Sequence, residues 1–485
     1  MMKPSNNLLH SLTAGIAAGL LVNASAQTSW VGNTSTDMNN AANWSGGIPS
    51  ASLNSILTTP GTSGASLVLT ADLQFGGGTA PGSNAMLFDG AAFSISGNSG
   101  TRQLTIGGQG LAINTTNTIT LDVARIRRNA SNTFEFLGSG GNLVINSEFS
   151  TNVTGTDTTT RIDFTGAGGN NNTITFNGNI VKVFPGTTPG TGVGNLILSS
   201  VGTGNKVVFN NASNTGFAGS VAIGNNALIH LGNGGSNGSL AGTTSISLGN
   251  TSSTLAINQS DSVIQGTDFA SSITGNGKVE QIGAGSTTLN AANTYSGGTF
   301  VTAGTLIVNN TTGSATGSGA VNVSTGAALG GAGIISGAVT ISGALKPGNS
   351  IGTITVGNDV TWNAGNSWQF ELGIASVDLA AANIGGTRDL LDITGGSNDF
   401  LKGTGSSWTF DFAGTGSVGY YKLVDWTGST TFSSSDFVAT NLNAGLSGSF
   451  VVDSGTSALY LNVIPEPGAA LLGGLGIVCL LRRRR

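Results

Sequence analysis

Short runs of alternating apolar and polar residues, separated by glycine, asparagine and serine, recur along most of this 485-residue chain. Clear examples lie at 103–106, 118–123, 142–145, 173–176 and 206–209. A period of two is typical of a half-buried β-strand, whereas stripes with the helical period are absent. Strands this short bury an apolar face only by stacking as successive coils of a solenoid. We therefore predict an all-β fold, a right-handed parallel β-helix, over residues 51–360.

The composition favours this prediction over the alternative of a flexible low-complexity polymer. The chain holds 79 glycines, and only 8% of its residues are charged, whereas 38% are hydrophobic. Disordered chains are usually charged and poor in β-branched residues. Because the apolar residues recur here in ordered runs, a folded solenoid explains the composition better.

Aromatic residues gather at both ends of the predicted solenoid. Residues 27–50 contain Trp30 and Trp44, and the other tryptophans all lie within 361–462. The terminal coils of a solenoid expose an apolar face and unpaired strand edges, so they need covering. We predict an N-terminal cap at 27–50 and a C-terminal β-subdomain or cap at 361–462. The alternative for Trp30 and Trp44 is a site where their rings stack on sugars.

The first 26 residues have the pattern of a secretory signal peptide. Lys3 precedes an apolar run at 12–22, and Ala24 and Ala26 form a cleavage site of small residues. We therefore expect export and a mature chain that begins near Gln27.

A stretch in the second half of the chain resembles a known repeat. Residues 293–299 read Asn-Thr-Tyr-Ser-Gly-Gly-Thr, and Ala-Gly-Thr-Leu follows at 303–306. This pattern resembles the repeat of autotransporter-associated β-strand proteins, and a weaker copy lies at 214–229. Residues 345–356 resemble an element that often follows such repeats. The resemblance, best within 205–360 and looser as far as residue 395, implies a β-helical architecture and says little about chemistry.

The segment 463–485 resembles the PEP-CTERM sorting signal of Gram-negative bacteria. Its parts, in order, are Pro465, Glu466 and Pro467, a largely apolar run at 468–481, and Arg482, Arg483, Arg484 and Arg485. The apolar run is marginal in length for a bilayer crossing, and the arginines would stay cytoplasmic. The resemblance implies transient membrane association, removal of the tail by an exosortase-type membrane protease, and release by the secretion machinery to the cell surface, the outer membrane or the extracellular matrix. The alternative is a plain tail anchor.

The charge limits the classes of partner that we expect, and the cysteine content limits the disulfides. Removing Lys3 and the four terminal arginines from the 17 basic residues leaves 12, against 22 acidic ones. Nucleic acid binding needs clustered positive charge, so we expect no nucleic acid partner. The only cysteine, Cys479, lies in the predicted sorting signal, so we expect no disulfide in the mature chain.

The chain offers few residues for catalysis. His230 is the only histidine after the signal peptide, and neither a nucleophile motif nor a nearby acid accompanies it. The paired Asp389 and Asp392 lie beside Arg388 and could suggest a carboxylate site. An equivalent strand is common in the repeat family that the chain resembles, and this resemblance favours a structural role for them. We expect no catalytic residues, no metal and no cofactor.

A polysaccharide lyase or hydrolase is the enzymatic alternative, because parallel β-helices often carry such enzymes. Its densest candidate region contains Asp122, Arg125, Arg127 and Arg128, with Glu135 close by. Alternation places Arg125 and Arg127 on one strand face, where they are able to contact an anionic glycan, and Asp122 and Arg128 on the other. Such runs are more often solvated faces.

These observations predict an exported, non-enzymatic β-helix that works as a structural or adhesive protein at the cell surface or in an extracellular polysaccharide matrix. A specific carbohydrate-binding surface protein is the second hypothesis, and the polysaccharide-active enzyme is the third.

Overall fold

The computed structural model describes residues 27–466, apart from 32–34, 50–53, 60–64, 76–85, 108–109, 129–131, 152–158, 165–168, 183–193 and 385–386. The predicted signal peptide at 1–26, with Ala24 and Ala26, and residues 467–485 therefore lie outside the described residues. The chain forms two compact units. Unit 1 comprises residues up to 233 and 237–246, and unit 2 comprises 234–236 and the chain from 247 onwards.

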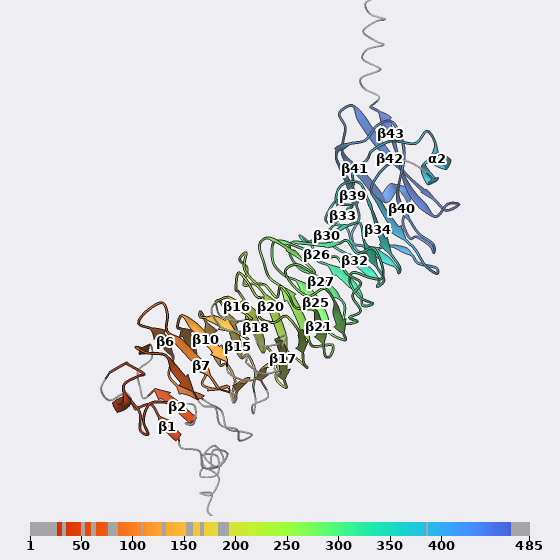
Figure 1. Ribbon diagram of the computed structural model, residues 1–485. Helices are drawn as coiled ribbons and strands as arrows, with labels where there is room; N and C mark the ends of the chain where they lie inside the picture. Colours follow the sequence, from red (N-terminus) through yellow and green to blue (C-terminus); the bar gives the residue numbers. More distant parts are fainter. Residues whose placement is uncertain are drawn as a thin grey trace, which may run out of the picture. The chain divides into compact units, whose positions relative to one another are not determined.

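Unit 1 consists of short parallel strands in three sheets (Figure 1). The first sheet contains, in spatial order, β1 (Gln27–Ser29), β2 (Asn54–Thr59), β5 (Met86–Gly90), β8 (Leu111–Asn114), β11 (Asn132–Phe136), β14 (Thr159–Phe164), β17 (Asn195–Ser200) and β19 (Ser220–Ile223). The second contains β3 (Ala65–Leu69), β6 (Phe93–Gly97), β9 (Thr118–Asp122), β12 (Asn142–Ile145), β15 (Thr173–Phe176), β18 (Lys206–Phe209) and β20 (Leu228–Leu231). The third contains β4 (Leu73–Phe75), β7 (Gln103–Ile106), β10 (Arg125–Arg128), β13 (Glu148–Ser150) and β16 (Ile180–Val181). The strand β21 (Ser245–Leu248) contains the boundary between the units.

Successive coils explain this strand order. From β2 to β15, each strand pairs with the strand three places further along the chain, so one coil contributes one strand to each sheet. In the second sheet Leu143 pairs with Ile119 on one side and with Ile174 on the other. This is the strand order of a parallel β-helix, as the alternating runs predicted.

Alternation along each strand builds the interior of unit 1. One row of side chains is fully buried and consists of Ile119, Leu143, Ile174 and Val207. The next residues along the first three strands, Thr120, Val144 and Thr175, are partly exposed and face outward. A second row is aromatic: Phe176 stacks on Phe209, with ring centroids 5.5 Å apart, and lies edge-on to Phe149 at 5.6 Å. Burying each such side chain contributes roughly 1.5–3 kcal/mol, so stacked rows hold the coils together.

Residues 27–49 form the first turn of unit 1. The strand β1 pairs with β2 at the edge of the first sheet, and Asp37 forms a parallel bridge with Val68 in β3. A short 3-10 helix, η1 (Ala41–Asn43), lies between them in sequence, and its N-cap Asn40 accepts a hydrogen bond from Ala42 N. The segment thus lies against the first strands of two sheets, at the position for which a cap was predicted.

Unit 2 also begins with parallel sheets. One contains β22 (Thr254–Ile257), β25 (Lys278–Gln281), β27 (Thr299–Val301), β29 (Val321–Val323), β32 (Val339–Ile341), β35 (Val360–Trp362) and β38 (Phe400–Lys402). Another contains β23 (Ser262–Ile264), β26 (Ser286–Leu289), β28 (Thr305–Val308), β30 (Ala328–Gly331) and β33 (Ala344–Pro347). The short strand β24 (Ile273–Gly275) precedes β25.

The C-terminal part of unit 2 departs from the coil pattern. One sheet has the order β31 (Ile334–Ile335), β34 (Thr353–Val356), β37 (Leu390–Ile393), β40 (Gly419–Asp425), β43 (Ala458–Pro465) and β42 (Leu446–Asp453). Another has β36 (Trp368–Gln369), β39 (Trp408–Thr415) and β41 (Phe437–Leu442). The strand β43 is antiparallel to both of its neighbours. A helix, α2 (Leu379–Ile384), and a 3-10 helix, η2 (Ser434–Asp436), complete this part.

Aromatic rings fill this C-terminal part. Trp362 and Trp368 stack with their centroids 3.7 Å apart, and Phe410 lies edge-on to both. The predicted all-β fold with parallel sheets is confirmed, whereas the right hand of the helix stays a prediction and α2 was not predicted. No helix among the described residues is long and apolar enough to span a membrane. The predicted sorting helix lies outside them.

Candidate functional site

The motif at 293–306 is the most distinctive pattern in the sequence. Buried hydrogen-bonding groups explain why these residue types occur there. Asn293 lies in the turn between β26 and β27 and is only 4% exposed. Its Oδ1 accepts hydrogen bonds from Ile273 N, at 2.9 Å, and from Gln265 Nε2, at 2.8 Å. Its Nδ2 donates to Ala315 O at 2.6 Å. One amide thus joins the coil before it to the coil after it.

The tyrosine of the motif is an interior residue. Tyr295 is fully buried, and its hydroxyl shares a 2.6 Å hydrogen bond with the hydroxyl of Thr299, which is buried too. Burial raises the pKa of Tyr295 well above its usual value, although the bond to Thr299 lowers it slightly. The side chain therefore stays neutral and works as a packing element, not as an acid or base.

Gly304 permits the tight corner before β28. Its φ is +63°, a left-handed conformation that side chains disfavour, and a Cβ placed there would lie 2.1 Å from Gly285 O in the preceding coil. Only glycine allows the backbones to come this close. The motif residues therefore act in stacking, which is why the sequence pattern indicates architecture and not chemistry.

Arg125 and Arg127 share one face of β10, as predicted, with the fully buried Ile126 between them. Arg125 aligns with Glu148 of the next coil, and its Nε lies 3.7 Å from Glu148 Oε1. Both side chains are partly exposed, so the pair contributes at most about 1 kcal/mol. Sequence reasoning missed Glu148, because the alignment of neighbouring coils is not visible in the chain.

The rest of the predicted charged cluster does not come together on one strand. Asp122 ends β9 in the second sheet of unit 1, Arg125 and Arg127 belong to the third sheet, and Glu135 belongs to β11 in the first. The side chain of Arg128 lies outside the described part. Glu135 aligns with Asp163, so its ladder neighbour is another acid. The described residues of the cluster therefore lie on three different sheets, whereas polysaccharide hydrolysis needs opposed carboxylates in one groove.

Trp30 and Trp44 lie inside the first turn of unit 1. Their exposed fractions are 5% and 4%, and the rings meet edge to face with centroids 5.1 Å apart. The indole Nε1 of Trp44 donates to Met38 O at 2.9 Å, in a buried environment. In this conformation neither ring presents a face to a sugar, which favours the covering role over the stacking alternative.

An outward ladder of asparagines follows the second sheet of unit 1. Asn177 Nδ2 donates to Asn146 Oδ1 at 2.9 Å, and Asn210 Nδ2 donates to Asn177 Oδ1 at 3.0 Å. The residues follow the ends of β12, β15 and β18, and Asn146 and Asn177 are exposed. The ladder gives this edge of the sheet a neutral, regularly spaced row of amides.

The two aspartates beside Arg388 face different surroundings. Asp389 is 2% exposed, and its carboxylate accepts hydrogen bonds from Gly352 N at 2.9 Å and from Glu371 N at 2.7 Å. Burial raises the pKa of Asp389 to about 7, although the two hydrogen bonds from backbone N–H groups lower this pKa.

Asp392 aligns instead with Asp425 in β40. Burial and then the charge of Asp425 raise the pKa of Asp392, while Lys422 lowers it. The two carboxylates therefore have different partners, which favours the structural interpretation.

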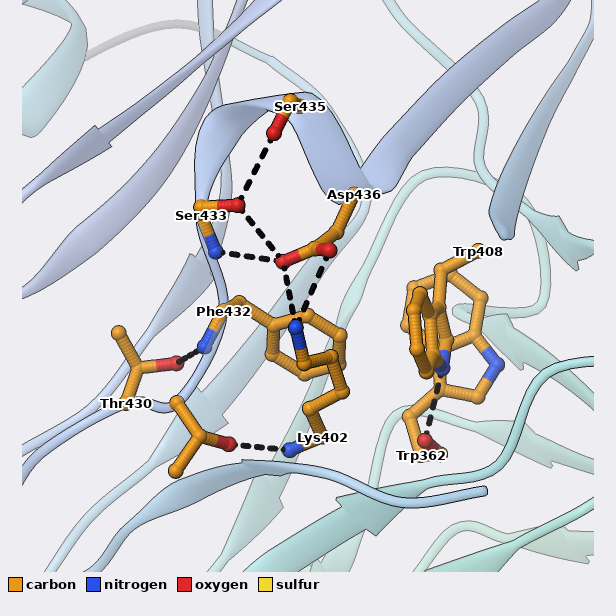
Figure 2. A network of polar contacts seen from close by, with 9 residues as sticks. Trp362, Lys402, Trp408, Thr430, Phe432, Ser433, Ser435 and Asp436 are labelled. Carbon is orange, nitrogen blue, oxygen red and sulfur yellow. Dashed lines mark hydrogen bonds and ion pairs between the residues drawn. The ribbon is translucent and has the colours of Figure 1, made fainter. Parts of the chain in front are cut away.

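Figure 2 shows a second polar network in the C-terminal part, around Lys402 in β38. The ammonium group of Lys402 lies 3.1 Å and 3.2 Å from the two carboxylate oxygens of Asp436, and 5.6 Å from the centre of the Trp408 ring. Trp408 Nε1 donates to Trp362 O at 2.8 Å. Burial raises the pKa of Asp436, but hydrogen bonds from Ser433 and the contact with Lys402 outweigh it and hold this pKa below its usual value. The network ties η2 to the aromatic core.

The remaining predicted residues are His230 and those of the sorting motif. His230 lies on the outward face of β20 and is half-buried, opposite Val208 in the ladder. Within the described residues, no group of three or more His, Cys, Asp or Glu side chains lies close enough to hold a metal ion. Pro465 ends β43 opposite Leu446. The other sorting residues, Pro467 and Arg482 to Arg485, lie outside the described range.

Comparisons with known proteins agree with this geometry. Residues 279–308, which contain the motif and the strands β26, β27 and β28, match the sequence model of a family described as the Passenger-associated-transport-repeat. A stretch of 193 residues, 39% of this chain, is 33% identical to the Adhesin BmaC autotransporter of Brucella suis biovar 1 (strain 1330). The chain covers 5% of the length of that protein. The chain thus contains an autotransporter-associated repeat and resembles part of an autotransporter adhesin.

Proposed function

We propose that this protein is an exported structural or adhesive β-helix of a Gram-negative bacterium, displayed at the cell surface or released into an extracellular polysaccharide matrix. The observation that carries the proposal is the stacked-coil unit with an autotransporter-associated repeat and the likeness to an autotransporter adhesin. The described candidate residues act in stacking, ion pairing and covering. In this proposal the role is non-enzymatic, and the solenoid winds with a right hand.

The route to the surface uses both terminal segments. Residues 1–26 direct export, and 463–485 act as a PEP-CTERM signal that holds the chain in the inner membrane until an exosortase-type protease removes the tail. The described end of the chain supports this role, because Glu466 N still bonds to Gly445 O at 2.8 Å. The sorting motif thus begins at the last residue of β43, and a protease that cuts after Pro467 leaves the described strands of unit 2 intact.

Adhesion in this proposal comes from the outward rows of neutral side chains. Amides and hydroxyls repeat at the strand spacing of about 4.8 Å, which lets one row bond several groups of a polysaccharide chain. The asparagine ladder of unit 1 is such a row, and its side-chain bonds are described. Each contact is weak, so binding depends on many contacts made together.

Retention of the purified protein on polysaccharide from the producing cells tests this proposal. We expect the double substitution Asn177→Asp and Asn210→Asp to reduce retention several-fold, because it places charges in a neutral ladder. The matched control is the double substitution Asn225→Asp and Asn233→Asp, an equal change at two exposed positions of unit 1. Equal retention of all three proteins would contradict adhesion through this row, and glycan turnover by the unmodified protein would contradict the non-enzymatic role.

A further inference from the structure

Four large apolar side chains of unit 2 are exposed near the end of β43. Ile374 is 71% exposed, Val377 87%, Val418 54% and Ile464 40%. Such side chains, when scattered singly, need no explanation, but several of them around the end of one strand pair mark a contact site. We call these four residues the exit collar.

Backbone pairing brings the collar together. Ser376 and Tyr420 exchange two hydrogen bonds, at 3.0 Å and 2.9 Å, which aligns the loop 373–378 with the start of β40. Gly419 in β40 aligns with Val463 in β43, so Val418 and Ile464 are the next residues along that pair. A Cβ on Gly419 would lie 2.8 Å from Ala375 Cβ, which shows how closely the loop approaches β40.

The collar lies beside the last described residues of the chain. The strand β43 ends at Pro465, directly after Ile464, and Glu466 makes the last described backbone bond. The sequence then continues with the largely apolar residues 468–481 and four arginines. A segment of this composition favours a bilayer over water, so the collar lies within a few residues of the point where the chain would meet lipid.

We propose that the exit collar rests on the surface of the lipid bilayer that holds residues 468–481. The proposal rests on the proposed membrane insertion of that segment. Valine and isoleucine side chains gain by leaving water for the boundary between headgroups and acyl chains. Asp378 and Glu466 are exposed beside the collar, so the surface that fits it is zwitterionic and not anionic. The contact holds the sorting motif, which begins at Pro465, at the level of the membrane surface.

Fluorescent labels on the full chain test the proposal. In a Cys479→Ala background, Val377→Cys or Val418→Cys carries an environment-sensitive nitrobenzoxadiazole label. Ser406→Cys, an exposed position before β39 and away from the collar, is the matched control. After reconstitution into phosphatidylcholine vesicles, we expect a blue shift, a several-fold rise in intensity and loss of iodide quenching at 377 and 418. The label at 406 should not change.

Flotation of the same vesicles separates the two claims. If the protein floats but the collar labels keep their emission in water, the collar proposal is overturned and membrane insertion stands. If the protein does not float, insertion itself fails, and the collar proposal with it. A blue shift that needs high protein concentration and no vesicles would show that a second copy covers the collar, which also overturns the proposal. A larger shift on phosphatidylglycerol vesicles would contradict the charge argument.

A second variant, Val418→Asp with Ile464→Asp, should return the label at 377 toward its emission in water while flotation persists.

Discussion

At the scale of single residues, buried amides join neighbouring coils at their corners. Asn172 Oδ1 accepts from Gly141 N at 2.8 Å, and Asn205 Oδ1 accepts from Asn172 N at 2.9 Å, so the same contact repeats from coil to coil in unit 1. Asn293 plays this part in unit 2. Sequence reasoning found Asn293 through its motif, but not its partners, because these lie about twenty residues away in both directions.

Replacing Asn293 by alanine should destabilise unit 2. The change leaves Ile273 N and Ala315 O buried without these partners, and each such group costs about 1–3 kcal/mol. Urea unfolding followed by circular dichroism measures the loss. Asn276→Ala is the matched control, because this exposed asparagine only accepts a long 3.4 Å bond from Ser296 Oγ. Equal unfolding midpoints for the two variants would contradict the role given to Asn293.

Asp389 should make the stability of unit 2 depend on pH. Its pKa rises from 3.8 in the unfolded chain to about 7 in the folded one, chiefly through burial. The folded state therefore binds the proton more tightly, so the free energy of unfolding falls as pH rises from about 4 to about 7 and levels off above that. Unfolding titrations at pH 5, 6, 7 and 8 measure this slope.

The substitution Asp389→Asn removes the titrating group and should flatten that slope. It also costs stability at every pH, because the amide nitrogen has to face one of two backbone N–H groups, those of Gly352 and Glu371. An unchanged slope in the variant would show that another group is responsible.

At the scale of strands and coils, the sequence predicted the strands better than their pairing. Alternation located runs such as β12 and β15 because one face of each strand is buried. The coils differ in length: paired residues lie 18 positions apart from Val321 to Val339 but 40 apart from Val360 to Phe400. Insertions in the corners cause this difference and leave no periodic signal. The charged residues around Arg125 were therefore assigned to one region, although they belong to three sheets.

Replacing Phe176 by alanine should destabilise unit 1 by about 3–5 kcal/mol, the usual cost of removing a buried aromatic ring. Phe176 contacts Phe149 and Phe209 in the neighbouring coils, so the change opens the aromatic row. The control is Thr175→Ala, one residue earlier in β15 on the outward face, for which we expect a change within about 0.5 kcal/mol. Thermal and urea unfolding compare the two, and similar losses would contradict the assignment of the inward face.

At the scale of the whole molecule, we propose a solenoid with a sorting segment at each end. The solenoid was predictable, because composition and alternation both require coils that stack. The C-terminal part was predicted only as an aromatic β-region, because its antiparallel pairs and α2 depend on contacts between distant segments. The sorting segments rest on sequence patterns at 1–26 and 463–485. Localisation and processing therefore decide whether the proposed surface role holds.

Fractionation of the producing cells, with intact-mass analysis of the recovered protein, tests the central claim most directly. We expect a protein outside the cell whose chain begins near Gln27 and ends near Pro467. A protein that keeps Arg482 to Arg485 and stays in the inner membrane would contradict release to the surface, and would make it a tethered protein of the periplasm.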